Sequence, residues 1–135
     1  MKKGMNPELG LAILRIVIGV IFVAHGWPKV GSIEGTAGFL GGIGIPLPAI
    51  AAWVVTILEL GGGILLLAGF LVTPVALLLT AHMLLGIIMV HAANGFYVLD
   101  QGTGGIEFNL LMAASSMMLV FGGPGLAALD SRNHS

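Results

Sequence analysis

The sequence contains no cysteine and very little charge. Its 135 residues include only five Lys or Arg and six Asp or Glu, for a formal net charge of -1. The absence of cysteine excludes disulfides, thiolate nucleophiles, Cys-ligated zinc and iron–sulfur clusters. The low charge leaves no basic stripe to bind a phosphate backbone, so we exclude nucleic acid as a partner.

Apolar residues are in excess. They make up 57% of the chain, and the mean hydropathy of +1.07 is higher than the surface of a water-soluble domain allows. The excess lies in long runs that are interrupted by Gly and Pro clusters, as membrane spans require. We therefore predict one membrane-embedded domain over residues 1–135, in contact with lipid.

Four apolar runs are long enough to be considered as spans, since about 20 helical residues cross a hydrocarbon core of about 30 Å. Pro28 is expected to end the first run, and a Gly-Gly-Pro-Gly cluster follows the last. The second and third runs are separated by only a few residues and must form an antiparallel hairpin. The sequence predicts an all-α, polytopic four-helix bundle with spans at about 9–27, 48–70, 74–93 and 106–121.

The distribution of Lys and Arg predicts the orientation of the bundle. Lys2, Lys3 and Arg132 lie on the side of both termini, against Lys29 alone on the other side. By the positive-inside rule, both termini are then cytoplasmic, and the chain is a multi-pass protein of the cell membrane. Arg15 interrupts the first run, so we interpret that run as a retained span and not as a cleaved signal peptide. The Gly-rich segment 32–47 is expected to be interfacial or re-entrant.

Ionisable residues inside the spans are the candidates for function, because each costs at least about 2.5 kcal/mol at the bilayer centre unless it is paired or hydrated. Arg15 and Glu59 lie deep enough, on neighbouring helices, to form a buried ion pair. Such a pair either fixes the register of two helices or takes part in function, and both interpretations stay open. The six candidates are Arg15, His25, Glu59, His82, His91 and Glu107.

A second group of polar residues lies near the non-cytoplasmic end. Water and a polar head group could enter there, so we predict a functional site formed by His25, Lys29, His91, Asn94, Tyr97 and Glu107. No metal site is predicted. His82 lies nine residues before His91, which at 100° per residue places the two on opposite faces of an ideal helix. We interpret His82 as a hydrogen-bonded packing residue.

Helical periodicity also predicts which faces point into the bundle. We expect one interior stripe on each of three helices. These stripes are Arg15, Gly19, Phe22 and Gly26; then Ala52, Thr56, Glu59 and Gly63; and last Glu107, Leu111, Ala114 and Met118.

Several motifs occur in an order that resembles the DoxX family. The first half carries Arg15, then His25-Gly26-x-x-Lys29, then Gly44-x-Pro46 and Glu59-Leu60-Gly61-Gly62. The second half carries His91-x-x-Asn94-Gly95-Phe96-Tyr97, then Gly104-Gly105-x-Glu107-Phe108, and Gly123-Pro124-Gly125 before Leu129-Asp130. The resemblance covers almost the whole chain and implies a small four-helix membrane protein. It also implies a link to quinone-dependent oxidoreductases, because the family takes its name from a subunit of a thiosulfate:quinone oxidoreductase.

The resemblance and the polar residues together favour a quinone-interacting subunit of a membrane oxidoreductase. We expect His91 and Glu107 to exchange protons with the quinone, since a His beside a carboxylate can both donate and accept. His25, Lys29, Asn94 and Tyr97 would bind the head group. Whether the isolated chain is an enzyme stays open.

Three other functions are considered. A small transporter or channel component would use Arg15, Glu59 and His82 as a proton relay or an anion site, and would require a homo-oligomer. A non-catalytic membrane anchor would recruit a soluble or membrane redox partner. Haem between His25 and His91 ranks last, because no spacing fixes their geometry.

Overall fold

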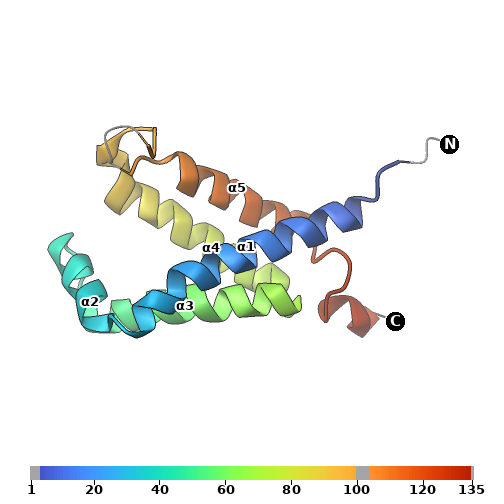
Figure 1. Cartoon of the computed structure of the whole chain (residues 1–135), viewed down its shortest axis with the longest axis horizontal. Coiled ribbons are helices and arrows are strands. Elements are labelled where there is room, and N and C mark those ends of the chain that lie inside the picture. Colours follow the sequence, from blue (N-terminus) through green and yellow to red (C-terminus); the bar gives the residue numbers. More distant parts are fainter. Residues whose placement is uncertain (1–3, 100–103, 135) are drawn as a thin grey trace.

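The helices that the sequence predicts are present in the computed structural model, which describes residues 4–99 and 104–134. Lys2 and Lys3 lie outside the described residues. The long helices are α1 (Pro7–Val30), α3 (Pro48–Ala68), α4 (Val72–Gly86) and α5 (Glu107–Gly122). They alternate in direction along the chain, so that α1 begins at the end of the molecule where the C-terminal segment lies (Figure 1). This confirms the predicted all-α membrane bundle.

Among the described residues, three helices are long and apolar enough to cross a membrane, namely Pro7–Val30, Pro48–Ala68 and Val72–Asn94, and the apolar helix Glu107–Gly122 is shorter. α1 does not end at Pro28 as predicted, but continues to Val30. Proline removes one backbone hydrogen bond and crowds the preceding turn. Because only two helical residues follow Pro28, this cost falls on the last turn alone, and the helix survives it.

Glycines bring α1 and α3 into backbone contact. A Cβ atom on Gly63 would lie 2.8 Å from the carbonyl oxygen of Gly19, and one on Gly26 would lie 2.5 Å from the amide nitrogen of Leu60. Any larger side chain would separate the helices, so these small residues set both the distance between α1 and α3 and their register. The predicted stripes on these two helices are confirmed, since all their members are buried.

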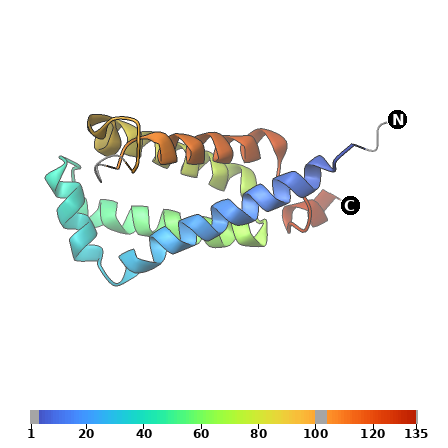
Figure 2. The same ribbon diagram turned by 45° about the horizontal axis from the view of Figure 1, so that its top comes forward.

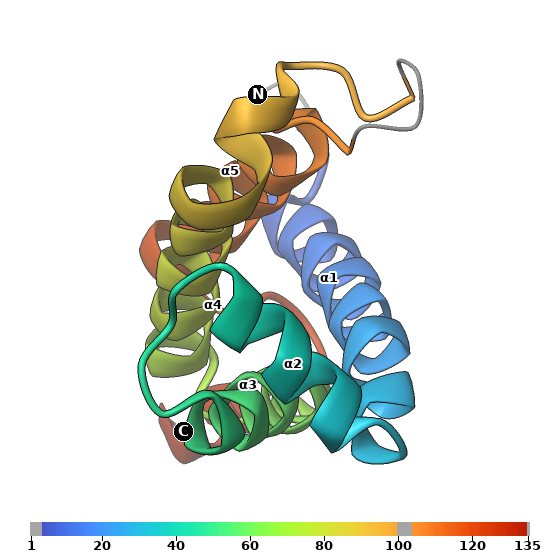
Figure 3. The same ribbon diagram turned by 90° about the vertical axis from the view of Figure 1, so that its left-hand side faces the viewer.

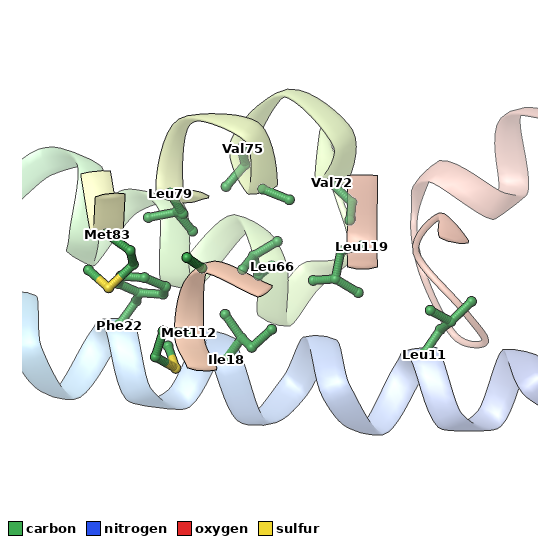
Figure 4. Close-up of a cluster of buried hydrophobic side chains, with 12 residues drawn as sticks. Leu11, Ile18, Phe22, Leu66, Val72, Val75, Leu79, Met83, Met112 and Leu119 are labelled. Carbon is green, nitrogen blue, oxygen red and sulfur yellow. The ribbon is translucent and has the colours of Figure 1, made fainter. Parts of the chain in front are cut away.

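The hydrophobic core lies where the four long helices meet. Ile18, Leu66, Leu79 and Leu119, one from each helix, are almost completely buried, and Figure 4 shows their side chains converging. Many large apolar side chains point outward instead, for example Ile57 with 64% exposed and Leu111 with 65% exposed. An apolar outer surface of this kind fits a lipid environment.

The helices form two pairs that lie closer together at one end of the molecule than at the other (Figures 1 and 2). At the end where the two pairs lie farther apart, the short helix α2 (Ile33–Gly42) lies across the bundle and packs on α3 (Figure 3). The predicted interfacial segment 32–47 is thus largely a helix. We call this the cavity end, and the end that holds the start of α1 and the C-terminal segment the terminal end.

α4 does not continue as a regular α-helix. A π-helical turn, η1 (Ile87–His91), follows it, and the 3-10 turn η2 (Ala92–Asn94) comes next. In the π turn the amide of Ala92 donates to the carbonyl of Ile87, five residues earlier, instead of four. The wider turn takes in an additional residue, so side chains beyond it face a different direction from that of an ideal helix.

The C-terminal segment folds back over the terminal end. The amide of Leu126 donates to Glu8 in α1, and the amide of Asp130 donates to Gly69 after α3. The Asp130 carboxylate accepts from the amides of Leu71 and Val72 at 2.9 and 2.8 Å, where α4 begins. A last 3-10 turn, η3 (Asp130–His134), follows. The segment therefore ties three helices together.

Candidate functional site

A cavity of about 480 Å³ lies at the cavity end, among all five α-helices. This volume lies within the range of pockets that bind small organic molecules. Most of the wall is apolar, with Phe22, Phe39 and Met89 among its members. The polar side chains that line it are Lys29, His25, Thr36, Glu59, His82, His91 and Asn109.

Three of these side chains form a hydrogen-bonded cluster that connects α1, α3 and α4. One carboxylate oxygen of Glu59 accepts from Lys29 Nζ at 2.7 Å, and the other lies 2.9 Å from His82 Nε2. Only 8% of the Glu59 side chain is exposed, against 28% for Lys29 and 20% for His82. Lys29 Nζ also donates to the His25 carbonyl at 2.9 Å, which holds the ammonium group in place. We call Lys29, Glu59 and His82 the Glu59 cluster.

The Arg15–Glu59 ion pair predicted from the sequence is wrong. Arg15 is 1% exposed, and its guanidinium donates through all three nitrogens to backbone carbonyl oxygens at 2.6–3.3 Å. These acceptors are Leu66, Leu67, Pro124, Leu126 and Ala127.

The register of α1 and α3 explains why the two charges do not meet. Gly19 lies opposite Gly63, and Arg15 and Glu59 each lie four residues before one of these glycines. Because the helices are antiparallel, four residues on each lead in opposite directions. At about 1.5 Å per residue, Arg15 and Glu59 are roughly 12 Å apart along the bundle. Glu59 is therefore opposite the Lys29 end of α1.

His82 and His91 both line the cavity, although the ideal helical angle places them on opposite faces. The π turn accounts for the difference, because it begins after His82 and ends at His91, which it turns back toward the interior. His91 Nδ1 is hydrogen-bonded to the carbonyl oxygen of Gly104, which ties the π turn to the loop before α5. His82 is thus a member of the site, and its interpretation as a packing residue alone is incomplete.

Comparison with known proteins identifies the family. The family model DoxX matches residues 10–92, which include most of α1, all of α2 and α3, and the Glu59 cluster. The chain belongs to the DoxX family. No solved structure matches it.

Relatives of this DoxX-family chain include named membrane proteins. It is 35% identical over 123 residues to a Bacillus subtilis protein named "Putative oxidoreductase CatD", covering 91% of this chain and 86% of that one. It is 31% identical over 124 residues to the Escherichia coli "Inner membrane protein YphA", covering 90% and 89%. It is 29% identical over 128 residues to the Escherichia coli "Inner membrane protein YqjF", covering 91% of each. Together with the apolar helices, these relatives identify the chain as a multi-pass membrane protein.

Three residues of the predicted site do not reach the cavity. Glu107 begins α5, and its carboxylate accepts from the amide of Val98 at 2.9 Å, which orders the preceding loop. Tyr97 is 62% exposed and packs edge-on against Phe96. Asn94 lies in η2, after the π turn. The structure therefore does not place Glu107, Tyr97 or Asn94 among the lining residues, whereas His25, Lys29 and His91 are there.

The interior face of α5 also differs from the prediction. Leu111 and Met118 are exposed, and the buried residues of α5 are Asn109, Met112, Ala113, Ser116 and Leu119. The prediction took Glu107 as an interior residue, but Glu107 belongs to the loop contact. Sequence analysis missed Asn109, which is 8% exposed, lines the cavity and donates weakly to the Met83 carbonyl at 3.4 Å. A polar amide within an apolar helix was the signal for it.

Two aromatic groups close the side of the cavity between α1 and α5. The ring of His25 lies against that of Phe108, with centroids 5.9 Å apart and planes inclined by 34°. His25 is exposed and also lines the cavity, so it stands at the rim. The site thus has a polar cluster on one wall, apolar walls around it and a histidine at the edge.

Proposed function

We propose that this DoxX-family protein binds a quinone in its cavity and serves as a quinone-interacting subunit of a membrane oxidoreductase. The observation that carries the proposal is the combination of a mostly apolar cavity with one hydrogen-bonding cluster, Lys29, Glu59 and His82, on its wall. A quinone has matching chemistry: an apolar ring and tail, and carbonyl oxygens that accept hydrogen bonds and take up protons on reduction.

The composition of the wall supports this class of ligand. Aromatic and flexible apolar side chains such as Phe22, Phe39 and Met89 suit a planar ring and an isoprenoid tail. The polar atoms are few and are concentrated at the Glu59 cluster, so a head group would be oriented by it. The exposed rim residues Phe39 and Met89 would contact lipid, from which a hydrophobic ligand could enter.

The name of the Bacillus subtilis relative, "Putative oxidoreductase CatD", points in the same direction, toward redox chemistry. The sequence assigned proton exchange to His91 and Glu107, and of these two residues only His91 lines the cavity. For His91 the role stays a prediction, and His82 is the competing candidate, because the Glu59 carboxylate lies next to its ring. A redox partner would supply or accept the electrons.

The alternatives have less support. A transporter relay through Arg15, Glu59 and His82 loses its first member, because every donor nitrogen of Arg15 is bonded to backbone carbonyls at the terminal end. The remaining pair, Glu59 and His82, leads only to the cavity. An anchor for a soluble partner needs no cavity. Measuring pH-dependent flux in liposomes and recovering a partner by co-purification test these two alternatives.

The experiment that tests the proposal uses neighbouring valines of α3. Val55 lines the cavity, whereas Val54 is 57% exposed on the outer surface. The purified protein is analysed in mild detergent by mass spectrometry for extracted quinones, and then titrated with a decyl-substituted 1,4-benzoquinone. We expect Val55→Phe to weaken binding by about tenfold or more, since the added ring occupies ligand space.

Val54→Phe is the matched control and should bind like the native protein. A native protein that binds no quinone, or equal binding by both variants, would reject the proposal. In a native membrane, the same Val55→Phe change should lower quinone-dependent turnover of the oxidoreductase that co-purifies with the protein. The anchor hypothesis predicts instead that this turnover is unaffected.

A further inference from the structure

The Glu59 cluster leaves one ring nitrogen of His82 unused. Its Nε2 is 2.9 Å from Glu59 Oε1, while no residue among those described forms a hydrogen bond with its Nδ1. The ring lines the cavity, and 20% of the side chain is exposed. A histidine ring with one nitrogen hydrogen-bonded and the other without a described partner can pass a proton to a ligand.

The partner of Nε2 determines which nitrogen carries the proton in the neutral ring. An ionised carboxylate only accepts, and Lys29 already donates to its other oxygen, so Nε2 must be the donor to Oε1. Nδ1 then carries a lone pair in the neutral ring and an N–H in the imidazolium. We propose that His82 Nδ1 is the atom that exchanges a proton with a ligand oxygen in the cavity, an assignment that rests on the proposed quinone function.

The step is a proton transfer. With a hydroquinone bound, its O–H bond breaks, the proton forms the N–H bond at Nδ1, and the electron pair stays on the ligand oxygen. The product is a hydroquinone anion beside an imidazolium, which the Glu59 carboxylate neutralises. Glu59 is a positioning residue here, because it acts through His82, and Lys29 holds Glu59 in turn.

The two ligand forms should respond differently to pH. A quinone carbonyl only accepts, so it is bound by the imidazolium but faces a lone pair when the ring is neutral. A hydroquinone O–H can donate to the neutral ring. As pH rises, affinity for the quinone should therefore fall relative to affinity for the hydroquinone, by roughly fivefold, the worth of one hydrogen bond.

Other titratable groups around the cavity must be separated from His82. α1 contributes Lys29 and His25, α3 contributes Glu59, and the π turn contributes His91. The lining residues of α2 and α5, such as Thr36 and Asn109, have no titratable group. Two histidines share the cavity but lie outside the Glu59 cluster, His25 and His91, and they are therefore the rival candidates that the experiment must separate from His82.

The experiment measures the dissociation constants of a decyl-substituted 1,4-benzoquinone and of its hydroquinone, from about pH 5 to about pH 8, where an imidazole changes charge. The full chain is used in detergent, and circular dichroism checks the fold of each variant. We expect the affinity ratio to lose its pH dependence in His82→Gln, whose amide can donate at every pH. His25→Gln and His91→Gln should keep it.

A ratio that still changes with pH in His82→Gln, or loses this dependence in His91→Gln, overturns the assignment while leaving quinone binding intact. Absence of binding of both probes by the native protein rejects the proposed function and the assignment together. Should His82→Gln fail to fold, Glu59→Gln tests the same point. The neutral amide of this variant can donate as well as accept, so it no longer fixes which nitrogen of His82 carries the proton. The roughly fivefold change of the quinone-to-hydroquinone affinity ratio with pH should then largely disappear.

Discussion

The two ends of the bundle use buried charge in opposite ways. At the terminal end, every N–H group of Arg15 has a backbone carbonyl as its acceptor, and the charge holds the C-terminal segment on α1 and α3. At the cavity end, the Glu59 cluster faces a space, and one ring nitrogen of His82 has no hydrogen bond to a described residue. A fully bonded charge stabilises a structure, whereas one with unused bonding capacity can act on a ligand.

The largest effect on stability is expected at Arg15. Arg15→Met removes a buried guanidinium and its hydrogen bonds to five carbonyl oxygens, one bond buried and four partly buried, which should lower the free energy of unfolding by about 3–5 kcal/mol. Thermal unfolding in detergent measures this change. Ile16→Met, on the exposed side of the same helix, is the control and should be nearly neutral. A stable Arg15→Met protein would contradict the structural role assigned to this residue.

A smaller loss is expected where α1 and α3 touch. In Gly63→Ala, the new methyl group would lie 2.8 Å from the Gly19 carbonyl oxygen and the Val23 amide nitrogen. The helices must move apart, at a cost of about 1–3 kcal/mol. Gly10→Ala in α1 is matched to it, because a Cβ at that position meets no atom within 4 Å. Equal melting temperatures for the two variants would count against a close contact between α1 and α3 at Gly63.

The Asp130 cap should contribute about 1 kcal/mol to the terminal end. Its carboxylate accepts from two amides at the start of α4, and loss of such a cap typically costs that much. Asp130→Ala should lower the melting temperature, while Ser131→Ala, which removes one long hydrogen bond of 3.3 Å, should change it less. Reversal of this order would place the anchor of the segment elsewhere.

The smallest effect on stability is expected at the cavity end. Lys29 is partly exposed, and Glu59 keeps His82 as a partner when Lys29 is removed. Lys29→Met should therefore cost less than about 1 kcal/mol. A double-mutant cycle with Glu59→Gln measures the coupling between the two residues. A loss of stability as large as that of Arg15→Met would contradict the distinction between the terminal end, where buried charge stabilises the fold, and the cavity end, where it faces a ligand site.

Sequence periodicity was sufficient for the arrangement of α1 and α3. The stripes through Arg15 and through Glu59 are both buried, because these helices are regular and their glycines lie on the contact face. The position of each charge along the bundle was not predictable from depth alone. The register of the two helices, which depends on the contact between Gly19 and Gly63, places Glu59 beside Lys29 and Arg15 beside the end of α3.

Two features lay beyond the sequence pattern. Backbone carbonyls have no signature in the sequence, so a segment that returns to bind Arg15 could not be foreseen, although Gly125 was needed for its close approach to Ala12. The π turn changes the angle between His82 and His91 without any change in composition. The error at His82 and His91 came from treating the helix as ideal across the π turn.

The π turn also matters for sequence alignment. Relative to a regular helix, it holds one additional residue between Gly86 and His91. A relative with one residue fewer in this segment would align through α4 only with a gap, and its histidine, eight residues after the counterpart of His82, would face the same wall from a regular helix. The length of this short segment is therefore a marker that can be read in any related sequence, and it divides chains that need a π turn to place a histidine at this wall from those that can do so with a regular helix.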